Sequence, residues 1–142
     1  MGLRLNITGS ENINLNETIV KDVKFGADIP KDSNARSTDL GATITIIGKI
    51  LAAVGGEAAD DTMKLAKWAL IPAENADCYR QLQIEVISAS QVVRRVNLPN
   101  AFVIGYEEDF ADESGVGTFT LTVKQKKDKM KTLSFEGGFA GE

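Results

Sequence analysis

Five carboxylates lie in one short stretch of the chain and are the first candidates for chemistry. They are Glu107, Glu108, Asp109, Asp112 and Glu113. A calcium-binding EF-hand loop needs oxygen ligands at alternate positions, and a glycosidase needs two carboxyl groups on either side of a cleft. Phe110 and Ala111 interrupt the calcium spacing. The sequence therefore favours a solvated strand end and turn over a metal site or a catalytic site.

The chain contains no histidine, and this removes most hydrolytic mechanisms. Ser–His and Cys–His nucleophiles need an imidazole, as do the common histidine-containing zinc sites. The single cysteine, Cys78, cannot form a disulfide within the chain and is expected to be a small buried apolar residue. We expect no catalytic residue, no metal and no cofactor, and the chain is predicted not to be an enzyme.

Length and composition are typical of one globular domain. The 142 residues are 43% hydrophobic and 25% charged, enough for a single core without disulfides or a structural metal. A net charge of -4 and an aromatic content of 6% argue against nucleic-acid binding. No apolar run is long enough to cross a bilayer, and residues 1–7 lack a signal-peptide core. We expect no membrane insertion and no signal peptide.

The elements that would position the carboxylates begin with β-strands. Alternating polar and apolar residues predict a strand over Leu3–Ile7. A second strand is predicted over Ile19–Phe25, with Ile19, Val23 and Phe25 on its buried side.

A polar segment, a strand and a helix are predicted next. Residues 26–39 have turn-forming composition and are predicted to be an extended loop, whereas Ala42–Ile50 is rich in β-branched residues and predicts a strand. A helix is predicted near residues 60–71, capped by Asp60 or Asp61. Its buried stripe is expected to contain Leu65, Trp68 and Ala69.

Strands return after Pro72. A hairpin is predicted from two strands, around residues 81–86 and 92–98, joined by a turn at 88–90. Pro99 and Asn100 are expected to break the second strand before a new one runs over Ala101–Phe110.

The last predicted strands carry a strict alternation. In residues 115–126, Phe119, Leu121 and Val123 are expected to face the core, and Thr118, Thr120 and Thr122 to line a wet face or a lumen. Phe135 marks a short final strand, and residues 136–142 are predicted to be a flexible tail. The fold class is therefore mainly β: an antiparallel β-sandwich or split β-barrel of about seven or eight strands with one helix.

The order of these elements resembles the haemolysin-coregulated protein (Hcp) family, the tube subunits of type VI secretion systems, which are related to phage tail tubes. The similarity covers residues 17–127. It begins with "DSNARSTDLGATITI", where Asp32, Arg36, Thr43 and Ile44 match, and continues through "ADDTMKLAKWAL". It ends in a strand that resembles the family pattern F-x-x-A-[YF]-x-V-x-Y-x-E-x-F. The matching residues there are Leu98, Ala101, Phe102, Tyr106, Glu108 and Phe110.

The resemblance implies a structural role in assembly. It implies a subunit that forms hexameric rings, which stack into the inner tube of a contractile injection machine, either a type VI system or a phage-tail-like particle. The implied partners are other copies of the chain and sheath, baseplate or spike proteins. The implied location is the cytoplasm before assembly, and then an exported or virion-like particle.

Charged residues are the candidates for contacts between subunits. The ring and stack candidates are Asp28, Lys31, Asp32, Arg36, Asp39, Glu107, Glu108, Asp109, Asp112, Glu113, Lys124 and Lys126. The acidic turn and the basic segment 124–131 are expected to attract one another between subunits. A monomeric β-module that binds a small ligand or carbohydrate remains the alternative, with a hydrolase as a distant third.

Overall fold

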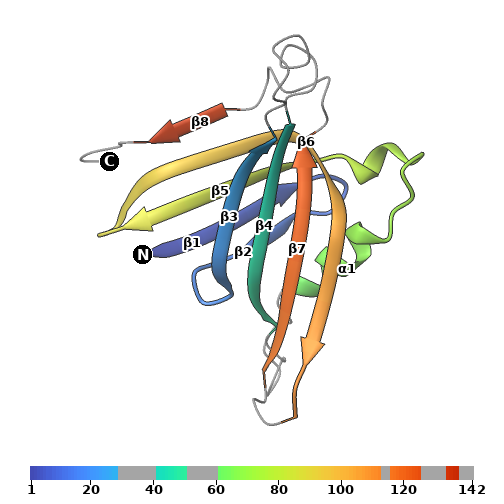
Figure 1. Ribbon diagram of the computed structural model, residues 1–142, viewed down its shortest axis with the longest axis horizontal. Coiled ribbons are helices and arrows are strands. Elements are labelled where there is room, and N and C mark those ends of the chain that lie inside the picture. Colours follow the sequence, from blue (N-terminus) through green and yellow to red (C-terminus); the bar gives the residue numbers. More distant parts are fainter. Residues whose placement is uncertain (29–40, 51–60, 113–115, 126–133, 138–142) are drawn as a thin grey trace.

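The computed structural model describes residues 1–28, 41–50, 61–112, 116–125 and 134–137 (Figure 1). Predictions for the remaining residues lie outside this part of the chain. The described part has eight strands, one α-helix and a short 3₁₀ helix. Their bounds are β1 Gly2–Thr8, β2 Ile13–Leu15, β3 Val20–Asp28, β4 Gly41–Ile50, α1 Thr62–Ala69, the 3₁₀ helix Ala76–Cys78, β5 Arg80–Ser88, β6 Gln91–Phe110, β7 Gly117–Gln125 and β8 Ser134–Gly137. No described helix is long and apolar enough to span a membrane.

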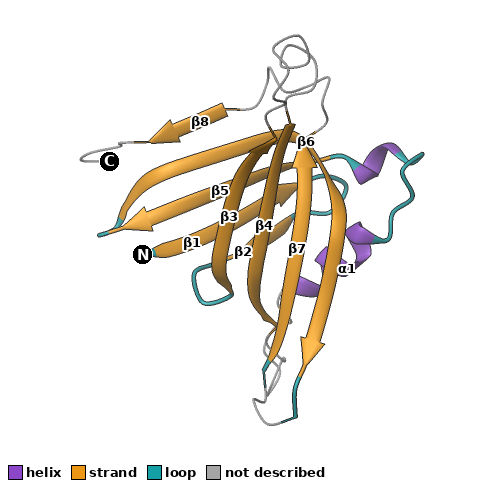
Figure 2. Cartoon of the chain, in the orientation of Figure 1, coloured by secondary structure: helices purple, strands orange, loops and turns teal. Residues whose placement is uncertain are grey.

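The strands form one antiparallel sheet in the order β2-β1-β5-β6-β7-β4-β3, with β8 added beside β6. The long strand β6 pairs with β5 through its first half and with β7 through its second half. The sheet therefore folds over into two layers, with α1 beside the second half of β6 (Figure 2). Among the described strands the sheet does not close into a barrel. The predicted mainly β fold with one helix is confirmed.

The core lies between the two layers and under α1. Its most deeply buried side chains include Leu5, Ile7, Ile44, Ile46, Leu82, Ile84, Phe119, Leu121 and Val123. The predicted core face of β7 is thus confirmed. Leu65 and Trp68 of α1 are also buried, and the Trp68 indole donates a hydrogen bond of 2.9 Å to the carbonyl of Cys78. Cys78 is buried, as predicted.

The predicted strand break at Pro99 and Asn100 is wrong, because β6 runs through both residues. Arg80 pairs with Ala101 and Leu82 pairs with Leu98, so β6 has one more residue than β5 at this point and forms a bulge. Proline is tolerated in a bulge because its missing N–H costs no ladder hydrogen bond. The Asn100 N–H instead donates to the side chain of the buried Gln125, at 3.1 Å.

The turn predicted at residues 88–90 is confirmed as a two-residue hairpin connection. Ser88 pairs with Gln91, and the two residues between them, Ala89 and Ser90, have φ values of 52° and 65°. Positive φ at both central positions is the pattern of a type I′ turn, whose twist matches that of the flanking strands.

Strand β3 differs from its prediction at both ends. It continues through residues 26–28, which the sequence assigned to the loop, and the rest of that loop lies outside the described residues. Phe25 was expected in the core but is 37% exposed, because β3 is an edge strand and the ring borders the open pocket between β3 and the other layer. Its ring packs edge-on against Phe135 of β8, with 5.0 Å between centroids.

The helix start and the C-terminal segment also differ in detail. Asp61 occupies the cap position of α1 but makes no capping hydrogen bond, because its carboxylate accepts the Asn14 N–H at 2.9 Å. Glu136 and Gly137, predicted as the start of a flexible tail, belong to β8. Arg95 holds them to the sheet, since its guanidinium bonds both Glu85 at 3.1 Å and Glu136 at 2.8 Å.

Candidate assembly surface

The second half of β6, with β7, β4 and β3, forms a four-stranded layer whose outer face is polar. Strict alternation turns Thr118, Thr120 and Thr122 away from the core residues of β7. The register places each threonine between a residue of β4 and a residue of β6. The rows across the sheet are Asp109, Thr118, Lys49; Glu107, Thr120, Ile47; and Gly105, Thr122, Thr45. The predicted threonine face is therefore one continuous surface of this layer.

The acidic residues lie along β6 at one end of this layer. Glu107 and Asp109 share the outer face with the threonines, and together with Glu108 they border a polar hollow that includes Thr118 and Thr120. Glu108 lies opposite the core residue Phe119 and accepts a hydrogen bond of 2.7 Å from the Tyr106 hydroxyl. Asp112 follows the strand and is exposed. No group of potential metal ligands occurs in the described residues.

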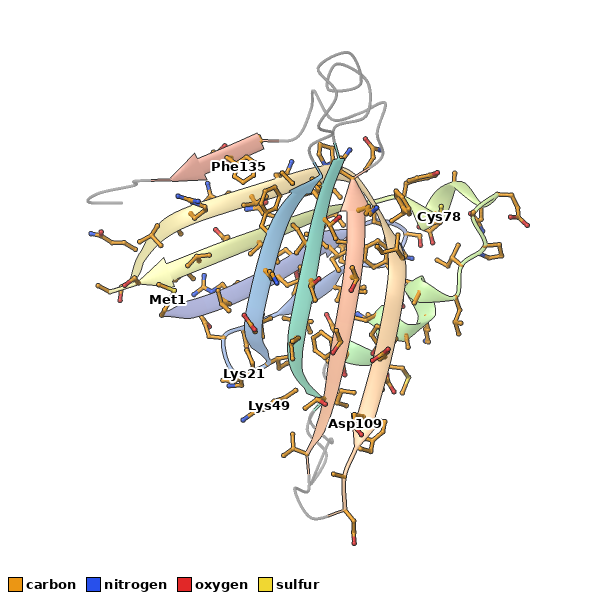
Figure 3. The ribbon with its side chains drawn as sticks, viewed as in Figure 1. Met1, Lys21, Lys49, Cys78, Asp109 and Phe135 are labelled. Atoms are coloured by element: carbon orange, nitrogen blue, oxygen red, sulfur yellow. The ribbon has the colours of Figure 1, made fainter. Side chains whose placement is uncertain are left out.

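Basic residues that the sequence analysis did not select lie toward the opposite flank of the layer. Lys21 and Lys24 belong to β3, and Lys49 is two strands away from Asp109 in the same row. Figure 3 shows Lys21, Lys49 and Asp109 gathered toward one end of the layer. The residues come together only through the pairing of β3 with β4, in which Lys24 lies opposite Thr45. This end is therefore acidic along β6, whereas β3 carries Lys21 and Asp22 there and Lys24 two residues further along.

The other residues predicted to contact neighbouring subunits lie either at the opposite end of the layer or outside the described residues. Lys124 lies opposite Phe102 and Thr43, at the end of β7 away from Asp109. Asp28 ends β3 and pairs with Gly41 at the same end as Lys124. The candidates that lie outside the described residues are Lys31, Asp32, Arg36, Asp39, Glu113 and Lys126. The structure thus separates Lys124 from the acidic residues within one subunit.

The two edge strands of the four-stranded layer each pair with a strand on one side only. Strand β3 pairs with β4 alone, and residues 102–110 of β6 pair with β7 alone, among the described strands. Unpaired edges expose backbone N–H and C=O groups and are ready to accept another strand.

A second polar cluster, away from this layer, is explained by packing. The buried guanidinium of Arg80 lies 5.6 Å from the Trp68 ring centroid and bonds Asp77 at 2.8 Å. Ser10 donates its hydroxyl to the same carboxylate at 2.6 Å. These hydrogen bonds, led by the one from Arg80, lower the pKa of Asp77 to about 2. The cluster joins the β1–β2 turn to the 3₁₀ helix.

No protein-family model and no curated protein matches the chain. Solved structures with the same fold do exist. Hcp1 from Flavobacterium johnsoniae is 18% identical, with a TM-score of 0.54 over 95% of this chain and 96% of that one. A chain of the anti-feeding prophage baseplate, six-fold symmetrised, is 10% identical, with a TM-score of 0.56 over 96% and 93%. A chain of the PVC sheath–tube complex, from an extracellular contractile injection system, is 14% identical, with a TM-score of 0.54 over 96% and 89%.

These similarities extend over nearly the whole length of each chain, so the likeness concerns the complete fold. The chain has the fold of Hcp and of subunits of contractile injection systems, as the sequence resemblance indicated.

Proposed function

We propose that this chain is a structural subunit that closes into hexameric rings, which stack to form the inner tube of a contractile injection machine. The observation that carries the proposal is the four-stranded layer with a polar outer face and two unpaired edges. In a ring, the edge of β3 on one subunit meets the edge of β6 on the next. Both edges of the four-stranded layer then have a partner, and the polar faces line a hydrated lumen.

The strand directions suit this closure. Neighbours in the order β6, β7, β4, β3 are antiparallel throughout, so β3 runs antiparallel to β6. A β6 strand added beside β3 would therefore continue the antiparallel pattern without a reversal. Strand β3 is 9 residues long, and residues 102–110 of β6 supply an edge of equal length.

The charges suit the same arrangement. The acidic edge of β6, with Glu107, Glu108 and Asp109, would meet the edge of β3, where Lys21 and Lys24 flank Asp22. Opposite charges across a contact fix its register and disfavour wrong partners. The position of Lys124 at the far end of the layer also allows it to approach Asp109 or Asp112 of the next ring when rings stack.

The symmetry and the partners come from the structural neighbours. One of them belongs to a six-fold symmetrised baseplate and another to a sheath–tube complex. A ring of six copies of this chain, working with sheath and baseplate proteins, is the corresponding arrangement here. The role is mechanical, in keeping with a sequence that has no histidine.

The test is the oligomeric state of the purified chain, measured by light scattering after size exclusion and by negative-stain microscopy over a range of protein concentrations. Rings with an open centre, with stacks at high concentration, are the expected result. A monomer at every concentration would contradict the proposal and favour the ligand-binding module.

The assignment of the threonine face to the lumen has its own test in assembled tubes. In a Cys78→Ser background, a Thr120→Cys variant should react with a small maleimide but be protected from a bulky polymer-linked maleimide. A Glu74→Cys variant, at an exposed position away from this layer, is the matched control and should react with both. Equal reaction of Thr120→Cys tubes with both reagents would place this face outside the lumen.

A further inference from the structure

Two apolar features lie at opposite flanks of the molecule. The first is a projecting side chain at the end of α1, where Leu70 is 83% exposed. Leu70 borders a groove between α1 and the unpaired edge of β6, beside Ile104, which is 49% exposed, and Glu108. This flank therefore presents an apolar projection next to an acidic strand edge.

The second feature is an apolar pocket of about 400 Å³ on the β3 flank. It opens between β3 of one layer and β1, β5 and the first half of β6 in the other. Leu3, Val23, Ile84 and Val86 contribute apolar surface. The charged side chains in the same lining are Lys21, Asp22 and Arg94. This flank therefore presents an apolar recess bordered by two basic residues and one acidic residue.

Both features lie on the same side of the four-stranded layer. The groove beside Leu70 includes Val103 and Tyr106, which lie opposite core residues of β7. The pocket includes Val23 and Ile44, which face the core from β3 and β4. When edges of neighbouring subunits meet, the projection at the β6 edge of one subunit approaches the pocket at the β3 edge of the next. This contact lies on the side of the layer away from the threonine face, and therefore away from the lumen.

We propose that Leu70 of one subunit inserts into the pocket beside β3 of the next, with Glu108 approaching Lys21 and Arg94 of that neighbour. The occupant of the pocket is thus a second copy of this chain, and its charge complements the lining. This inference rests on the proposed ring and assigns its lateral contact. Because the projection and the pocket are different surfaces, the contact is head-to-tail and can repeat until the ring closes.

The experiment uses two variants that block opposite halves of the contact. Leu70→Lys replaces the apolar side chain with a positive charge, which the basic residues of the pocket would repel. The same charge is favourable at the C-terminal end of a helix, so the variant should fold. Val86→Trp fills the pocket without adding charge. Each variant alone should lose rings, with the lateral association constant lowered on the order of 100-fold, as expected for the loss of a buried leucine. Met63→Lys is the matched control, because Met63 is exposed on the same helix but does not border the groove.

Mixing the two variants distinguishes this contact from any symmetric one. The Val86→Trp chain retains its projection and the Leu70→Lys chain retains its pocket, so one intact contact can form between them. The equimolar mixture should therefore contain one-to-one dimers, although each variant alone is monomeric in light scattering. If Val86→Trp fails to fold by circular dichroism, Leu3→Trp fills the same pocket from β1.

The outcomes separate this inference from the proposed function. Rings of Leu70→Lys at the wild-type concentration would overturn the inference and leave the ring intact. A mixture that remains monomeric would also overturn it. A wild-type chain that forms no ring would overturn the proposed function itself.

Discussion

The ion pair between Asp77 and Arg80 supports the sharpest stability prediction. Arg80 is only 4% exposed, and its Nη1 has no hydrogen-bond partner among the described residues, so Asp77 supplies the compensating charge. Replacing Asp77 with Asn keeps the side chain's size but leaves a buried cation without its counterion. Breaking a buried pair in this way costs about 3–5 kcal/mol, and the remaining amide oxygen can recover part of it. We expect Asp77→Asn to lower the free energy of unfolding by about 2–4 kcal/mol at pH 7.

The pH dependence of this effect is also fixed by the structure. The Asp77 pKa is about 2 in the folded chain, below the ordinary value of 3.8, so the stabilisation is complete above about pH 4. It disappears as the pH falls through about 2, because the carboxylate is then protonated in both the folded and unfolded chain. The linkage contribution of this shift is on the order of 2 kcal/mol.

Urea denaturation of both proteins between pH 7 and pH 2 measures the difference. The stability difference between wild type and Asp77→Asn should be constant down to about pH 4 and narrow below it. Glu74→Gln, at an exposed carboxylate nearby, is the control and should stay within about 0.5 kcal/mol of wild type. A pH-independent difference, or a stable Asp77→Asn protein at pH 7, would refute the role assigned to the pair.

Three further substitutions test packing and backbone geometry by chemical denaturation. Gly48→Ala should destabilise strongly, by about 2–4 kcal/mol, because its Cβ would lie 2.5 Å from the Phe119 ring. Gly26→Ala should be tolerated, because the nearest atom to its Cβ would be the Thr43 carbonyl oxygen at 4.0 Å. Equal effects of the two substitutions would contradict this packing. Gln125→Leu should cost about 1–3 kcal/mol by leaving the Asn100 N–H without its acceptor, and an unchanged midpoint would show that the bulge does not depend on it. Ser90→Gly should stabilise by up to about 1 kcal/mol because φ is 65° at this position, and a loss of stability would argue against the type I′ turn.

Alternation along β7 could be predicted from the sequence because one side of this strand is packed and the other is not. Phe119, Leu121 and Val123 are buried, and the intervening threonines mark the other face without reference to any distant residue. Periodicity of this kind is a local signal.

The course of β6 could not be predicted locally. Pro99 is a strand breaker in most contexts, but here the strand forms a bulge against β5. The next residue, Asn100, donates its N–H to Gln125, which is 25 residues further along the chain. Asp61 shows the same limit, because its carboxylate accepts the Asn14 N–H and pairs with Lys64 but does not cap a backbone N–H of the helix that it precedes. In both cases the local structure depends on residues that are distant in the sequence.

The acidic part of the candidate assembly surface could be predicted from the sequence, but the flank opposite it could not. The acidic residues are adjacent in sequence, and their cluster stands out in the chain. The complementary flank includes Lys21 of β3 and Lys49 of β4, and these strands lie side by side only when they pair. The pocket beside β3 draws on both layers and has no signature in the sequence.

Native mass spectrometry of the purified chain tests the central claim most directly, because it counts subunits in each assembly. The proposed head-to-tail ring predicts a closed hexamer as the dominant complex, without a stable series of intermediate sizes. A chain that is only monomeric, or that stops at a symmetric dimer, would contradict the account.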